Sequence, residues 1–136
     1  MIEIKNIDKS FADTKILKDL SFVFDKGLTN LVIGQSGSGK TVLLKCLLGL
    51  YKPDNGSILF NGMDIVNMTH KKLKRLRRDI GMVFQGGALF DSMNVEENVL
   101  FPLQMFSDMA PQEMLDRVNF CLTRVNLHNV NHLYPS

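Results

Sequence analysis

Residues 34–41 read G-Q-S-G-S-G-K-T, the spacing of a phosphate-binding loop. Glycines at these positions let the backbone curl so that successive N–H groups point at a polyphosphate. The lysine adds a positive charge for the phosphates, and the threonine hydroxyl can ligate Mg²⁺. We therefore expect the loop to bind a nucleoside triphosphate with Mg²⁺. The expected contact residues are Gly34, Ser36, Gly37, Ser38, Gly39, Lys40 and Thr41.

The segments on either side of the loop support this interpretation. Residues 31–33 form an unbroken apolar run, which predicts a buried strand over 28–33. Residues 42–48 are largely apolar and predict a helix from about Gly39 to near Tyr51, with its positive dipole end at the anion. The order strand, loop, helix is that of a phosphate-binding unit. The alternative is a Gly/Ser turn beside a core helix.

Other apolar patterns predict further strands and one more helix before residue 86. Ile2 and Ile4 alternate with polar residues, as do Leu20, Phe22 and Phe24, which predicts two half-buried strands. A short strand over 57–60 ends at Asn61-Gly62, a hairpin signal, and 80–84 predicts a second buried strand. Between them, a helix is expected from Thr69, as N-cap, to Arg78.

The pattern becomes helical after residue 86. Asn94 and Glu97 have the spacing of a capping box, and Pro111 suits the first turn of another helix. Residues 126–136 show no regular pattern. We therefore expect a β-rich and α/β part followed by a helical part.

Composition and charge argue against several classes of protein. The 136 residues carry a net charge of +2, but segment 70–78 holds six of the 16 Lys and Arg residues and no acid. The rest carries 14 acidic side chains against ten basic ones, which argues against a nucleic-acid-coating protein. There is no signal peptide pattern and no apolar run long enough for a bilayer. Two cysteines form no convincing disulfide framework, so the expected compartment is the cytoplasm.

Three further segments together resemble the ATP-binding subunits of ABC transporters. These are Asp19-Leu20-Ser21-Phe22, the stretch 49–58 after the expected helix, and Ile80-Gly81-Met82-Val83-Phe84-Gln85, which resembles the entry to the Q-loop. The resemblance implies an α/β fold: a P-loop NTPase core with an antiparallel β subdomain and the start of a helical subdomain, incomplete at the C-terminus. The implied division is 1–86 and 87–136, with the Q-loop assigned to the second part. Segments 84–92 and 97–103 look most like the ATPases of MCE/Mla-type lipid transporters.

The resemblance assigns roles to two residues outside the phosphate loop. Gln85 matches the Q-loop glutamine, which in the family contacts Mg²⁺ and the attacking water, so it is the expected catalytic residue and second metal contact. Its alternative is a polar residue at a strand end. Phe11 matches the aromatic residue that stacks on adenine, usually a tyrosine, and a phenyl ring keeps the π-face. Its alternative is core packing near a turn.

The family's later motifs have no match here: the signature, the acidic strand-end pair, the D-loop and the switch histidine. Tyr134-Pro135-Ser136 resembles the residues just before the signature. We therefore expect the chain to be the amino-terminal part of such a subunit, about 50 to 60% of it. We expect this part to bind ATP and Mg²⁺ but not to hydrolyse ATP alone. The complete protein would form a homodimer beneath transmembrane permease subunits, cytoplasmic and peripheral on the inner face of the cell membrane. No nucleic-acid partner is expected.

Some features remain open. The basic segment 70–78 is either a solvated helix face, with Leu73, Leu76 and Ile80 buried, or a contact for anionic lipid heads. His128 and His132 stand four apart, but no third metal ligand lies at convincing spacing. An apolar cluster lies between 89 and 106, either helical core or permease contact, and uncovered it would favour self-association or domain swapping.

Two other functions compete with the transport ATPase. A P-loop small-molecule kinase would need a lid whose arginines reach the phosphates, and the only arginine cluster is at 75–78. A non-catalytic nucleotide-sensing or oligomerising module would keep a vestigial loop.

Overall fold

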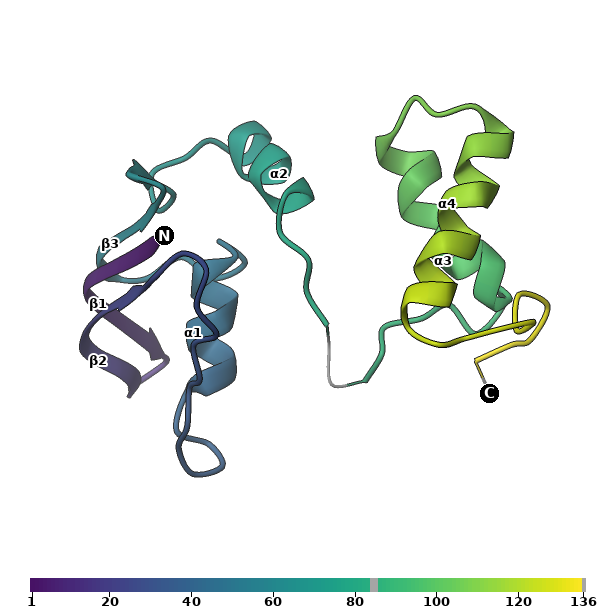
Figure 1. Ribbon diagram of the computed structural model, residues 1–136. Coiled ribbons are helices and arrows are strands. Elements are labelled where there is room, and N and C mark those ends of the chain that lie inside the picture. The colour runs from purple at the N-terminus through teal and green to yellow at the C-terminus, as the bar shows by residue number, and fades with distance from the viewer. Residues whose placement is uncertain (84–85, 136) are drawn as a thin grey trace. The chain divides into compact units, whose positions relative to one another are not determined.

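The computed structural model describes residues 1–83 and 86–135, which divide into two compact units, Met1–Gly81 and Met82–Ser136 (Figure 1). Unit 1 contains the strands β1 (Ile2–Phe11), β2 (Thr14–Phe24), β3 (Asn55–Phe60) and β4 (Met63–Asp64). It also contains the helices α1 (Lys40–Leu47) and α2 (His70–Arg78). Unit 2 contains α3 (Val95–Phe106) and α4 (Pro111–Arg124). The expected α/β class with an antiparallel sheet is confirmed.

The strands of unit 1 form one antiparallel sheet in the order β2-β1-β3-β4. Ile4 of the central strand β1 pairs with Phe22 on one side and with Ile58 on the other. The register shifts between Ile4 and Ile7, where Asn6 adopts a φ of 48°. This irregularity inserts one residue, so that Ile4 and Ile7 are both buried although they are three residues apart.

The predicted hairpin at residues 61–62 is confirmed. β3 and β4 pair through Phe60 and Met63, and the two residues between them have φ values of 48° and 82°. Positive φ at both central positions is the requirement of a type I′ turn, which Asn-Gly meets at low cost.

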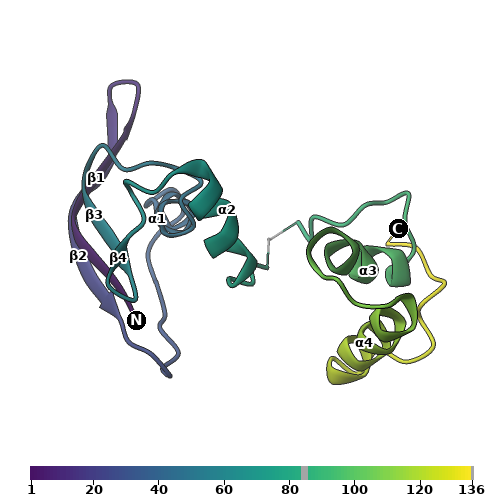
Figure 2. The ribbon, with the colours of Figure 1, turned by 90° about the horizontal axis from the view of Figure 1, so that it is seen from above.

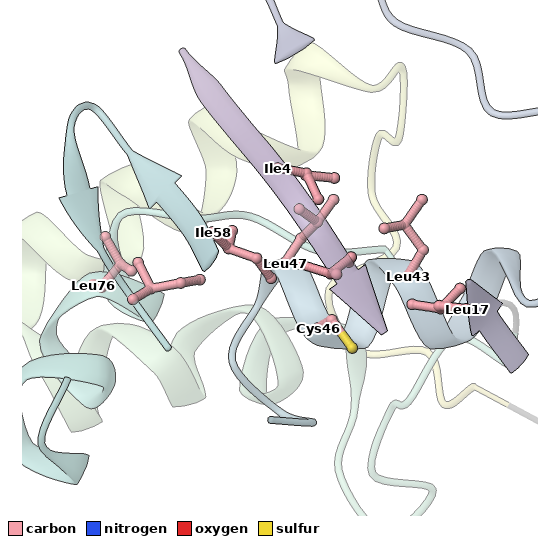
Figure 3. Packing of buried hydrophobic residues seen from close by; sticks show 9 residues of the cluster. Ile4, Leu17, Leu43, Cys46, Leu47, Ile58 and Leu76 are labelled. Carbon is pink, nitrogen blue, oxygen red and sulfur yellow. The ribbon is translucent and has the colours of Figure 1, made fainter. Parts of the chain in front are cut away.

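The core of unit 1 lies between the sheet and α1 (Figures 2 and 3). Cys46 and Leu47 of α1 face strand residues such as Ile4 and Ile58, and Leu76 of α2 closes one end. Burial raises the pKa of the Cys46 thiol, which here packs as a small apolar side chain. The buried cluster consists of Ile4, Ile7, Leu17, Leu43, Cys46, Leu47, Ile58, Ile65 and Leu76.

Two predicted strands are not formed within the described residues. Residues 28–33 and 80–83 have no strand assignment, and residues 84–85 lie outside the described part. Leu31, Ile33 and Val83 are 83%, 81% and 96% exposed. A strand exists only where a neighbour completes its hydrogen-bond ladder. The four strands of the sheet pair among themselves, so these apolar runs have no partner among the described residues.

Helix α1 is shorter than expected and ends at Leu47 rather than near Tyr51. Helix α2 fits its predicted range, with Thr69 in the N-cap position but without a side-chain cap bond. The interpretation of α2 as a solvated basic face needs one correction. Arg77 is half-buried, and it donates from Nε to the Leu48 carbonyl (2.8 Å) and from Nη2 to the Gly49 carbonyl (2.6 Å). A cation at these carbonyls complements the negative end of the α1 dipole.

Unit 2 is a pair of helices with its own small core, Val118 and Leu122 of α4. The predicted capping box is present: Glu97 N–H donates to the Asn94 side chain and Asn94 N–H to the Glu97 carboxylate, each at 2.8 Å. Pro111 occupies the first turn of α4, as expected. The irregular tail is tied down where Val95 N–H donates to the Leu133 carbonyl at 2.8 Å.

The structure also bears on the pair of histidines near the C-terminus and on membrane-spanning helices. Within residues 1–83 and 86–135, no three potential metal ligands come together, and His128 and His132 are exposed. In the same part of the chain, no helix has the length and apolar character to cross a membrane.

Gly56 lies where β3 passes close to the backbone of β1. Gly56, the second residue of β3, has a φ of +83°, and a Cβ there would collide with the carbonyl oxygens of Lys5 and Asn6. Because those atoms belong to the central strand, they cannot move without breaking its ladder. We expect Gly56→Ala to lower the free energy of unfolding by at least about 3 kcal/mol, measured by urea denaturation.

Gly62→Ala is the matched control. Gly62 has nearly the same φ, +82°, but a Cβ there meets nothing within 4 Å. This substitution carries only the left-handed backbone cost, about 1–2 kcal/mol. Equal losses in the two variants would contradict the close packing of β1 and β3.

Candidate nucleotide-binding site

The phosphate loop is built by backbone conformations that favour glycine. Gly37 and Gly39 have φ values of 78° and 94°, and Gly39 is the N-cap of α1. A Cβ at Gly34 would lie 2.7 Å from Ser38 Oγ, so a side chain at this position would require the Ser38 hydroxyl to move. The loop therefore curls tightly at the lower end of α1 in Figure 1, as the glycine spacing predicts.

The loop and helix start leave backbone donors available. Ser38 N–H donates to the Gln35 carbonyl at 3.2 Å. In the described part of the chain, the N–H groups of Gly37, Gly39 and Lys40 have no protein acceptor. Unpaired N–H groups at a helix start favour a bound anion, and the helix dipole adds to the effect. The residues present therefore fit a phosphate group.

Lys40 places its charge across the loop. Its Nζ donates to the carbonyls of Gly34 and Gln35, both at 2.7 Å. These bonds bring the ammonium over the segment whose backbone would face a polyphosphate. Thr41 is exposed at the first turn of α1, where its hydroxyl is accessible to a metal ion.

A cleft of about 220 Å³ lies beside the loop. Its lining joins β2 to the start of α1 and includes Ile16, Leu17, Ser38, Gly39 and Lys40. A larger cavity of about 530 Å³ lies elsewhere in unit 1, between the β4 hairpin and α2, and contains none of the loop residues. The smaller cleft is the candidate site because the phosphate-loop chemistry is there.

Phe11 ends β1 and is 42% exposed. Its ring contacts the ring of Tyr51, with centroids 5.2 Å apart and planes at 68°. Lys9 Nζ lies 5.5 Å from the Phe11 centroid and forms an ion pair with Asp54 at 2.7 Å. Phe11 is therefore partly accessible and partly packed, which leaves both base stacking and turn packing available to it.

The same contacts lower the pKa of the Asp54 carboxyl below its usual value. The main cause is the hydrogen bond from Lys9, followed by the bond from the Ser10 N–H. These bonds favour the ionised Asp54 carboxylate, which joins the 51–54 turn to β1. No local pattern marks Lys9, Tyr51 or Asp54 as residues of the site. The contacts that bring them to Phe11 and to the end of β1 include Phe11–Tyr51 and Lys9–Asp54, which join residues 40 and 45 positions apart.

Gln85 lies outside the described residues. Its predicted catalytic and metal-binding roles therefore remain predictions from the sequence. The structure places the loop residues 34–41 together at one helix end, and it places Phe11 on the hairpin that leads into β2.

Comparison with known proteins gives consistent matches. The family model described as "ABC transporter" matches residues 17–135. The "Probable ribonucleotide transport ATP-binding protein mkl" of Mycobacterium leprae is 39% identical over 98% of this chain and 39% of its own length. The "Methionine import ATP-binding protein MetN" of Clostridium tetani is also 39% identical, over 99% of this chain and 42% of its own length.

Solved structures agree with these matches. The ATP-binding cassette MJ0796, in a dimeric post-hydrolysis state bound to ADP and Pi, superposes with a TM-score of 0.89 at 28% identity. The match covers 99% of this chain and 62% of that chain. Of the two curated relatives, Mkl and MetN, the chain spans about two fifths of the length.

The conformation of Gly39 generates a prediction for the loop. A Cβ at Gly39 would lie 2.9 Å from Ile16 Cγ2 and 3.2 Å from Leu17 Cδ2, whereas one at Gly37 would meet nothing within 4 Å. Both positions carry the left-handed backbone cost of about 1–2 kcal/mol, but only Gly39→Ala also pushes α1 away from β2. We expect Gly39→Ala to lower the melting temperature by several degrees more than Gly37→Ala, measured by circular dichroism. Equal shifts would show that the helix start does not pack on β2 as described.

Proposed function

Because the chain belongs to the ABC transporter family, we propose that its 34–41 loop binds ATP with Mg²⁺ as part of a transport ATPase. The observation that carries this proposal is the glycine-built loop at the start of α1, with unpaired N–H groups and the Lys40 ammonium across it. The geometry by itself fits any polyphosphate, and membership of the family supports ATP as the ligand.

On binding, we expect Lys40 to exchange its two carbonyl acceptors for phosphate oxygens. The N–H groups of Gly37, Gly39 and Lys40 would donate to the same phosphates, and Ser36 and Ser38 would complete the cradle. Thr41, together with Gln85, would hold Mg²⁺, whose charge supports phosphoryl transfer. Phe11 would supply a ring face for adenine.

Hydrolysis is proposed for the complete protein and not for these 136 residues alone. Phosphoryl transfer requires groups that orient water and hold the metal in addition to the loop. In the family these include the acidic pair and the partner's signature motif, neither of which has a match in this sequence. We therefore expect nucleotide binding without appreciable phosphate release.

The partner proteins are also proposed from membership of the ABC transporter family. A complete subunit would dimerise and act beneath transmembrane permease subunits, on the cytoplasmic side of the cell membrane. The solved relative MJ0796 is dimeric, which supports the first part. Exposed apolar side chains of unit 2, among them Leu89, Phe90 and Met105, are candidates for a permease contact or for self-association.

The transported substrate is a separate proposal. Segments 84–92 and 97–103 resemble lipid-transport ATPases, which suggests a phospholipid. The two curated relatives carry names for ribonucleotide transport and methionine import, so their names give the lipid proposal no support. Assay of the intact transporter with each of these three substrate classes would distinguish them.

The competing functions are weakened to different degrees. Family membership argues against the small-molecule kinase, and Arg77 of the arginine cluster is bonded to the end of α1 instead of being available for a lid. A non-catalytic module with a vestigial loop stays open, and nucleotide titration separates it from the ATPase proposal.

The test is titration of the chain with labelled MgATP, with and without EDTA. We expect saturable, Mg²⁺-dependent binding that Lys40→Ala weakens at least about tenfold, because the loop loses its point charge. A parallel assay of phosphate release should show no turnover.

Lys74→Ala is the matched control, since Lys74 is an exposed lysine of α2 distant in sequence from the loop. It should bind MgATP like the unaltered chain. Binding that is absent, independent of Mg²⁺ or indifferent to Lys40→Ala would refute nucleotide binding at this loop and favour the vestigial-loop alternative.

A further inference from the structure

Two aromatic rings from distant parts of the chain meet beside the proposed base site. Phe11 comes from the β1–β2 hairpin and Tyr51 from the segment after α1, yet their rings are in edge contact at 5.2 Å. We propose that Tyr51 is a positioning residue for nucleotide binding, which holds the Phe11 ring at a fixed place relative to the phosphate loop. This inference rests on the proposed ATP site.

Tyr51 is fixed to the same helix that begins at Lys40. Its backbone N–H and that of Leu50 both donate to the Lys45 carbonyl, at 3.1 and 2.8 Å. The Lys45 ammonium lies 5.1 Å from the centroid of the Tyr51 ring and 3.5 Å from its Oη. The ring is half-buried and packs against the core of unit 1. Tyr51 therefore has a defined position at the C-terminal end of α1.

Phe11 is fixed to the 51–54 turn by polar contacts as well as by the ring contact. Asp54 accepts from Lys9 Nζ at 2.7 Å and from the Ser10 N–H at 2.6 Å. The Asp54 N–H donates to the Asp8 carbonyl at 2.8 Å. These three bonds hold the end of β1 against the turn that carries Tyr51.

The consequence is a rigid connection between the two halves of a nucleotide site. The phosphates would bind at the start of α1, and the base would bind at Phe11. The ring contact links Phe11 to the end of α1, so the distance between these two places is set by the helix. Loss of the Tyr51 ring should free Phe11 and weaken the part of the affinity that depends on the base.

The test compares two ligands, MgATP and magnesium tripolyphosphate, which shares the phosphates but lacks the base. We expect Tyr51→Leu, which keeps an apolar side chain in the core, to weaken MgATP about three- to tenfold and to leave tripolyphosphate unchanged. In a Phe11→Leu background the same substitution should have no further effect, because Tyr51 acts through Phe11. Tyr51→Phe should retain the affinity of the unaltered chain.

A second measurement leaves the ring contact intact. The chain has no tryptophan and two tyrosines, so Tyr134→Phe makes Tyr51 the sole tyrosine. MgATP should change the tyrosine fluorescence of this variant, and tripolyphosphate should not. Tyr134→Phe should also bind MgATP like the unaltered chain, which makes it the control for Tyr51→Leu.

The outcomes separate this inference from the proposed function. If neither ligand binds in a Lys40-dependent manner, the ATP site itself is wrong, and the inference falls with it. If both ligands bind but Tyr51→Leu weakens neither or weakens both equally, the site stands and the positioning role is wrong. Tyrosine fluorescence that responds identically to both ligands would also overturn the role.

Discussion

The packing of α1 on one face of the antiparallel sheet is the contact on which unit 1 depends. Cys46 and Leu47 are buried against Ile4 and Ile58, and these residues form the centre of the core. A helix of eight residues has little stability alone, so it persists because its apolar face is covered. The phosphate loop is the connection into this helix, and its shape therefore depends on the same packing.

Contacts at both ends fix where α1 lies. At its start, Gly39 lies so close to Ile16 and Leu17 of β2 that a Cβ there would force one of these side chains or the helix to shift. Beyond its end, Arg77 of α2 binds the carbonyls of Leu48 and Gly49, where a cation offsets the helix dipole. The helix thus has one defined position between β2 and α2, and the loop residues 34–38 before its start are exposed.

Elements that form from residues close together in the sequence were predicted correctly, whereas predicted strands that need distant partners were not formed. The Asn61-Gly62 hairpin and the Asn94–Glu97 capping box were predicted correctly, because each is formed by residues within four positions of one another. The predicted strands at 28–33 and 80–83 are absent from the described residues. Their apolar composition indicates burial between neighbouring strands, but a ladder requires partners that the sheet of unit 1 does not provide.

The phosphate loop can be predicted from local residues alone, because the glycine spacing, the lysine and the following helix specify one backbone shape. The same residues carry the resemblance to ABC transporter subunits, and the family model that matches residues 17–135 agrees with it. Only the tertiary structure brought Phe11 to Tyr51 and Arg77 to the end of α1. These contacts join residues that are 28 to 40 positions apart. Their formation depends on how the helices and strands pack, and a local pattern carries no information about that.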